Sequence, residues 1–191
     1  MTDERAPHHS PFSRGWHARV RLLLLVPFLY ACWLGMMAVH EAGHVLHAWM
    51  SGGTVSAVRV PLVGFSLTEF STNPRPHFVA WGGAVWGCVL PLLLWSTFHI
   101  QRLPGRKPVQ LFAGFCLIAN GAYLGAGWKA NAGDAADLVD YGTPAWVLVV
   151  FGVVASGAGL YLWHLLGKSP SPRPSPLRTV RLRSRQAGER G

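Results

Sequence analysis

Charged residues are scarce in this chain. Only 13% of its 191 residues are charged and half are hydrophobic, whereas charged residues make up about 25% of a soluble domain. Acidic residues are the rarer sign, with eight Asp and Glu against seventeen Lys and Arg. This composition argues against an ordinary soluble globular domain.

Four apolar stretches are each long enough to cross a hydrocarbon core, which requires roughly 20 residues. They are Leu22–Met50, Phe78–Ile100, Val109–Trp128 and Ala145–Leu166. The first follows several arginines, as the core of a signal peptide does, but it is longer than the roughly 7–15 residues of such a core. The sequence therefore predicts an all-α polytopic membrane protein with about four transmembrane helices.

The basic residues are divided unevenly between the two sides of these four stretches. Arg59, Arg75 and Lys129 lie on one side, and the other fourteen of the seventeen Lys and Arg lie on the side of both termini. The positive-inside rule therefore places both termini in the cytoplasm. This bias accounts for most of the net charge of +9, so a nucleic-acid partner is not needed. Arg far outnumbers Lys, and Ala and Gly abound, as in proteins encoded by GC-rich bacterial genomes. We therefore expect a bacterial plasma membrane.

Three regions follow from this pattern. Residues 1–21 form a basic cytoplasmic N-terminus, residues 22–166 the transmembrane domain, and residues 167–191 a tail rich in Pro, Ser and Arg. The tail has little to bury and is predicted to be disordered. Its basic residues either rest on the anionic lipid head groups of the bilayer or are solvated and serve topology alone.

Cysteine and histidine set further limits on a metal site. The three cysteines lie in separate apolar stretches at no metal-ligand spacing, so they are predicted to be small core residues. Three of the nine histidines form the one histidine cluster, HEAGHVLH, from His40 to His47. Iron-dependent membrane desaturases and hydroxylases require several histidine-rich boxes, and a single cluster excludes that class.

The HEAGH segment lies near the end of the first apolar stretch, in which Glu41 is the only carboxylate. Polar groups within a membrane helix are costly and usually functional. Residues four apart share one helix face, so His40 and His44 can bind one zinc ion, with Glu41 beside that face. The HExxH pattern is typical of metalloproteases, in which the glutamate is the general base. The alternative is a polar helix end at the membrane interface.

The third ligand has to come from elsewhere. His47 shares the helix face but lies about 10 Å along the axis from His40, so it is predicted to be a supporting or interfacial group. Three of the eight acidic residues fall in GDAADLVDYG, 133–142, on the same side as the end of the first stretch. Asp134 and Asp137 are the candidate ligands. The alternative is an exposed turn in which Asp134 caps a short helix.

The segment from Ser51 to His77 fits neither a membrane span nor a tail. Its β-branched and aromatic residues are bounded by Gly-Gly and Asn-Pro, which predicts short strands or a hairpin. Such a strand either pairs with an extended substrate at its edge, or the segment is a simple loop packed over the bundle.

HEAGHVLHAWMSGGTVSAVRVP resembles the active-site helix and following extended stretch of the intramembrane zinc metalloproteases that include the site-2 proteases. The likeness extends to WGGAVWGCVLP and NAGDAADLVDYGTPAW. The resemblance implies a zinc-dependent endopeptidase that cleaves membrane proteins, with Glu41 as the base and His40, His44 and Asp134 as zinc ligands. The competing class is a membrane protein with a non-catalytic metal site for structure or partner binding.

The chain departs from that family at three points. The family's late aspartate stands in a Leu-Asp-Gly context, whereas Ala135 follows Asp134 here. The nearest apolar-segment asparagine is Asn120, which either orients substrate or bonds a neighbouring helix. Many site-2 proteases act near the cytoplasmic face, whereas the charge rule places HEAGH toward the opposite one. Either this branch is inverted, or the chain has a further half-span.

Overall fold

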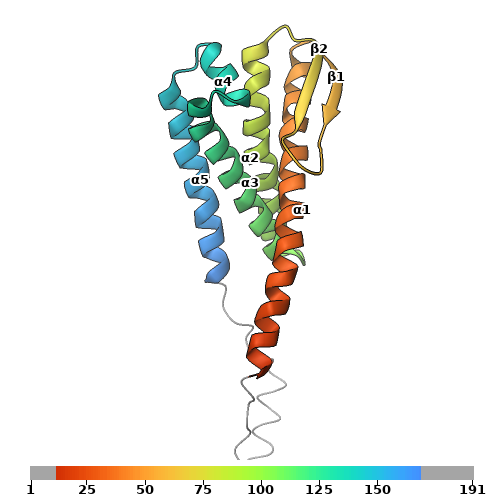
Figure 1. Cartoon of the computed structure of the whole chain (residues 1–191), viewed down its shortest axis with the longest axis vertical. Helices are drawn as coiled ribbons and strands as arrows, with labels where there is room; N and C mark the ends of the chain where they lie inside the picture. Colours follow the sequence, from red (N-terminus) through yellow and green to blue (C-terminus); the bar gives the residue numbers. More distant parts are fainter. Residues whose placement is uncertain (1–11, 169–191) are drawn as a thin grey trace, which may run out of the picture.

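A computed structural model describes residues 12–168 of the chain. It is mostly helical, with one short two-stranded sheet (Figure 1). The elements are, in order, α1 (Phe12–Met50), β1 (Thr54–Arg59), β2 (Leu67–Thr72), α2 (Pro76–Ile100), α3 (Arg106–Gly127), the 3-10 turn η1 (Trp128–Ala130), α4 (Gly133–Asp140) and α5 (Ala145–Gly167).

The four long helices correspond to the four predicted apolar stretches. Their segments long and apolar enough to cross a membrane are Leu23–Met50, Pro76–Ile100, Arg106–Ala130 and Ala145–Gly167. The helices alternate in direction, with the hairpin and α4 together at one end of the bundle (Figure 1). Helix α1 begins at Phe12, so part of the predicted N-terminal region is helical. The tail predicted to be disordered lies almost entirely outside the described residues.

Close packing between helices depends on residues without side chains. A β-carbon added at Gly43 of α1 would lie 2.8 Å from the carbonyl carbon of Gly82 in α2. Small residues of this kind let membrane helices approach closely. Because Gly43 directly precedes His44, this contact presses the histidine-bearing turns of α1 against α2. The three cysteines are buried, which confirms their prediction as core residues.

Strands β1 and β2 form an antiparallel hairpin, which confirms the prediction of short strands after α1. Their register pairs Thr54 with Thr72 and Arg59 with Leu67. The loop between the strands folds back beside α1, where the Tyr30 hydroxyl donates a hydrogen bond to the carbonyl oxygen of Leu62 at 2.8 Å. Tyr30 precedes His40 by ten residues, about 15 Å along a helix axis. The hairpin and its loop therefore lie beside the part of α1 that leads to the HEAGH turns.

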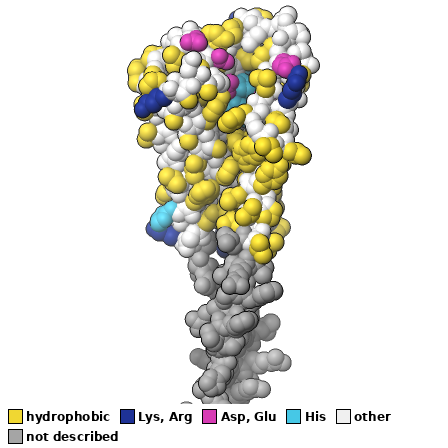
Figure 2. Space-filling model, viewed as in Figure 1, with side chains coloured by type: hydrophobic (Ala, Val, Ile, Leu, Met, Phe, Trp, Pro, Cys, Tyr) yellow, Lys and Arg dark blue, Asp and Glu magenta, His cyan; other side chains and the backbone are white. Residues whose placement is uncertain are grey.

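Helix α4 closes the same end of the bundle. The chain reaches it through Asn131 and Gly133, both with positive φ, at 50° and 55°. Its buried side chains, Ala135 and Leu138, pack with Ala84 and Leu124 of α2 and α3. Acidic side chains gather at this end, whereas hydrophobic side chains cover much of the middle of the visible face (Figure 2). The acid-rich segment and the HEAGH turns thus meet at one end.

Candidate metal centre

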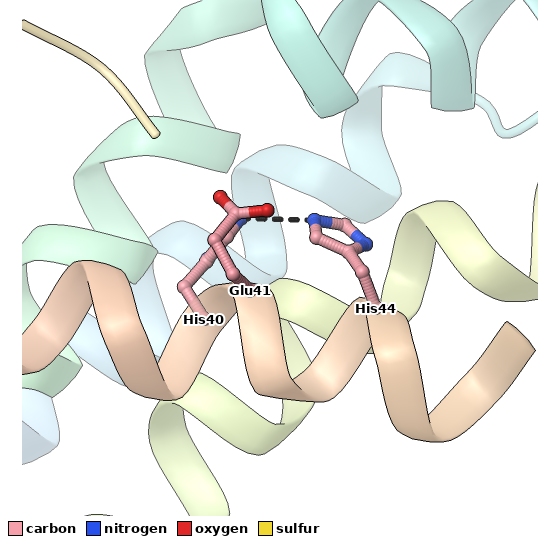
Figure 3. A group of neighbouring side chains, drawn as sticks. All are labelled: His40, Glu41 and His44. Atoms are coloured by element: carbon pink, nitrogen blue, oxygen red, sulfur yellow. Dashed lines mark hydrogen bonds between the residues drawn. The ribbon is translucent and has the colours of Figure 1, made fainter. Parts of the chain in front are cut away.

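The HEAGH segment lies within the last three turns of α1, and three of its side chains project toward one side of the helix (Figure 3). His40, Glu41 and His44 are all buried, with exposed fractions of 7%, 3% and 6%. One ligand atom from each lies within 4.8 Å of the others. The two histidine Nε2 atoms are 3.2 Å apart. This buried group could hold a metal ion.

Helix α4 brings Asp134 to the same point. Its Oδ2 atom lies 2.8 Å from Nε2 of His40 and 3.2 Å from Nε2 of His44. The other candidate, Asp137, is exposed and lines a cavity beside the centre, which is described below. Within residues 12–168, Asp137 makes no hydrogen bond to either histidine. The structure thus places Asp134, and not Asp137, against the histidine pair. Asp134 does not cap α4, because its side chain is directed to α1.

Hydrogen bonds on the far side of each imidazole fix its tautomer. His44 Nδ1 donates to the carbonyl oxygen of Val79 at 2.8 Å. His40 Nδ1 donates to Oδ1 of Asn120 at 2.7 Å, and the Asn120 amide is itself oriented because its Nδ2 donates to the carbonyl oxygen of Cys116. With both protons on Nδ1, both Nε2 atoms direct a lone pair toward Asp134. Such partners are typical of metal-binding histidines.

The donor set fits a cation. Two imidazole lone pairs and one carboxylate oxygen converge with separations of 2.8–3.2 Å, an arrangement that is repulsive unless protons or a metal ion lie between them. A tetrahedral zinc site with bonds of about 2.0–2.1 Å places its ligand atoms roughly 3.3 Å apart. The observed triangle is slightly tighter than that, and two histidines with one carboxylate are a known catalytic zinc set.

Electrostatics at Asp134 favour the charged carboxylate. Burial raises the pKa of Asp134. When the imidazole rings are protonated on Nε2 as well as on Nδ1, however, the hydrogen bonds that His40 and His44 donate outweigh burial and hold that pKa well below its usual value. Asp137 shows the opposite behaviour, since partial burial and the neighbouring charges of Asp134 and Asp140 raise the pKa of its carboxyl. The carboxylate that meets the histidines is therefore the one held ionised.

Glu41 has a partner that the sequence did not indicate. The Thr68 hydroxyl, on β2, donates to Oε2 of Glu41 at 2.5 Å. Thr68 is buried to 7% exposure, although most of the hairpin is open. Among residues 12–168, the hairpin therefore holds one oxygen of the Glu41 carboxylate, and the other is left for a group in the cavity.

His47 and Asn120 both serve the packing around the centre. His47 Nδ1 donates to the carbonyl oxygen of Phe78 at 2.7 Å, and its ring stacks on the Phe78 ring. It does not reach the two other histidines and instead ties α1 to α2. Asn120 bonds a neighbouring helix through His40, the second of the two roles considered for it.

A cavity of about 480 Å³ opens beside the centre. It has hydrophobic walls and a few polar groups, as small-molecule and peptide sites usually do. Its apolar lining includes Trp33, Met36, Met37, Phe65 and Phe70, and its polar lining includes His40, Glu41, His44, Asn120, Tyr123 and Asp134. The centre is therefore accessible to a molecule that enters between α1, α3 and β2.

Comparison of the chain with protein-family models, characterised proteins and solved structures finds no match in any of the three. The function has to be inferred from the residues of the centre and its cavity.

Proposed function

We propose that this chain is a zinc-dependent intramembrane endopeptidase of the site-2 protease type, which hydrolyses peptide bonds in or near membrane-spanning segments. The convergence of His40, His44 and Asp134 beside Glu41 carries the proposal. A structural zinc site usually uses four protein ligands, whereas a catalytic one uses three and leaves a position open. Three ligands facing a cavity favour the catalytic kind.

The roles of the residues follow from their positions. His40, His44 and Asp134 would hold the metal. A zinc ion bound there supplies Lewis-acid polarisation of the scissile carbonyl and lowers the pKa of a water molecule toward 7. Glu41 accepts the proton of the attacking water through its free oxygen and passes it to the leaving amine. Thr68 fixes the other oxygen and so orients the carboxylate.

The cavity and the hairpin support a peptide substrate. Trp33, Met36 and Met37 lie on the turns of α1 before HEAGH and form an apolar wall. Met side chains adapt to differently shaped partners, which suits an apolar segment of variable sequence. The loop before β2 contributes Phe65 and Ser66 to the cavity, and β2 contributes Leu67, Thr68 and Phe70. An extended substrate could pair with an edge of this hairpin, since edge addition is a common mode of peptide recognition.

Two measurements on detergent-purified protein test the proposal. The first is zinc content by mass spectrometry after zinc reconstitution, for wild type, His44→Ala, Asp134→Ala and the matched control Asp137→Ala. We expect about one zinc per chain in wild type and in Asp137→Ala, and strong loss in the other two. Absence of zinc from the wild type after reconstitution would rule out the proposal.

The second measurement is cleavage of a membrane-spanning peptide by wild type and Glu41→Gln. We expect Glu41→Gln to keep its zinc and lose cleavage, because Glu41 is not one of the three ligands. If Glu41→Gln cleaves as fast as wild type, or if zinc-loaded wild type cleaves no tested transmembrane segment, the non-catalytic alternative holds.

A further inference from the structure

We infer that Tyr123 is a further catalytic residue, whose hydroxyl donates a hydrogen bond to the oxygen of the scissile carbonyl. The inference rests on the proposed peptidase function. Tyr123 belongs to α3 and lines the cavity together with Glu41 and Asp134. Its ring meets that of His40 edge-on, with 5.7 Å between the ring centroids. The side chain thus lies next to the proposed ligands and faces the space where substrate would bind.

The chain around Asp134 is built to fit this hydroxyl. The backbone N–H of Asp134 donates to the Tyr123 oxygen at 2.9 Å. The preceding residue is Gly133, where any β-carbon would overlap the same oxygen. Gly133 also has a φ of 55°, a backbone conformation that residues other than glycine rarely adopt. The backbone of both Gly133 and Asp134 is therefore fitted closely around the phenol oxygen of Tyr123.

The proton of this hydroxyl is left available. A phenol has one proton to donate and can also accept. Among residues 12–168 the hydrogen bonds of the Tyr123 hydroxyl consist of the one that it accepts from Asp134. A hydroxyl that accepts a hydrogen bond is polarised and becomes a better donor. The donor side of Tyr123 can therefore serve an acceptor within the cavity.

Peptide hydrolysis supplies that acceptor. As the water oxygen bonds to the carbonyl carbon, the electron pair of the C=O double bond moves to the carbonyl oxygen, and Glu41 takes a proton from the water. A donor already in place for the charge that develops stabilises this step. The carbonyl then re-forms as the C–N bond breaks, and Glu41 gives its proton to the amine. Tyr123 keeps its own proton throughout.

A purely positioning role for Tyr123 makes a different prediction. If the hydroxyl did no more than hold Asp134, Tyr123→Phe would weaken zinc binding, and excess zinc would restore activity. If it stabilises the carbonyl oxygen, Tyr123→Phe keeps one zinc and loses turnover, because the phenyl ring and its packing on His40 are retained. Zinc content and binding of a transition-state mimic distinguish the two roles without relying on turnover.

The experiment compares wild type, Tyr123→Phe and the control Tyr161→Phe, whose tyrosine is 62% exposed on α5. Zinc per chain, kcat and KM on a transmembrane peptide, and the Kd of a phosphinic peptide are measured with one equivalent of zinc and again with excess zinc. For Tyr123→Phe we expect unchanged zinc, a kcat lower by about 10²–10³-fold, little change in KM and a similar loss of phosphinate affinity.

Two results would overturn the inference. One is a kcat for Tyr123→Phe within threefold of wild type, and the other is a loss of turnover that added zinc reverses. A Glu41→Gln variant measured alongside separates this failure from failure of the proposed function. If Glu41→Gln is inactive and Tyr123→Phe is normal, the inference about Tyr123 alone is wrong. If wild type and Glu41→Gln behave alike, the peptidase proposal falls and the Tyr123 inference falls with it.

Discussion

Gly83 of α2 forms the wall beside the two histidines, and replacing it with alanine tests the geometry of the centre. A β-carbon at Gly83 would lie 2.7 Å from Cδ2 of His40 and closer still to Nε2 of both His40 and His44. Ordinary carbon contacts begin at 3.4 Å. The rings would therefore have to retreat by 0.7 Å or more.

A metal ion held by these ligands would not tolerate a movement of this size. Metal–ligand distances hold to within about 0.2 Å, so both imidazoles would leave the range in which they bind. Retreat is also opposed by the hydrogen bonds at the far side of the rings, to Asn120 and to the carbonyl oxygen of Val79. Each such bond that breaks leaves a buried group unsatisfied, at roughly 1–3 kcal/mol. We therefore expect loss of two of the three ligands together with moderate destabilisation.

The assay is zinc affinity, measured by competition with a chromophoric chelator, together with thermal unfolding of the metal-free protein in detergent. Gly157→Ala is the matched control. Gly157 lies inside the apolar helix α5, and a β-carbon added there meets nothing within 4 Å. We expect Gly83→Ala to lose zinc affinity by more than about 100-fold, beyond the roughly 10–100-fold typical of indirect contacts. Wild-type affinity in Gly83→Ala would refute the ligand geometry.

Further predictions concern the groups around the centre. Asn120→Ala should lower zinc affinity by roughly 10–100-fold, because His40 loses the partner that fixes its tautomer; the chelator assay measures this. Thr68→Val should lower kcat and leave zinc content unchanged, while Thr68→Ser, which keeps the hydroxyl, should restore turnover. The folded pKa of Asp134 lies below its unfolded value, so its stabilising effect is present above about pH 4 and is lost as the pH falls through the folded pKa. Metal-free wild type should therefore lose thermal stability with acid more steeply than Asp134→Asn. A reporter fused at the C-terminus should report a cytoplasmic location in bacterial cells.

Local patterns in the sequence were enough to predict the helices and two of the three converging side chains. Apolar length alone identified the four long helices. The spacing of His40 and His44 follows from helix geometry, because residues four apart share a face whatever the rest of the fold does. The hairpin after α1 was likewise marked by β-branched residues between turn signals.

Long-range contacts decided what the sequence left open. Asp134 and Asp137 both lie in α4, but only the side chain of Asp134 meets the histidines of α1. That choice depends on the rotation of the helix, which the positive φ of Gly133 and the bond from Asp134 to Tyr123 set. Neither follows from the spacing of the acids. Thr68 was missed for the same reason, since it meets Glu41 across 27 residues and belongs to no motif.

The hairpin also bears on which side of the membrane the centre faces. A further half-span was one of two explanations for a HEAGH segment placed toward the non-cytoplasmic end. The loop at Leu62 does return along α1 as far as Tyr30, but β1 follows the end of α1 and β2 precedes the start of α2. An element that enters and leaves at the same end adds no crossing, so the described residues keep four candidate spans. With four spans, the distribution of basic residues still predicts cytoplasmic termini. We therefore expect HEAGH to lie toward the non-cytoplasmic face, the inverse of the arrangement in many site-2 proteases. Under the proposed function, a substrate would be cut near the face opposite the basic tail.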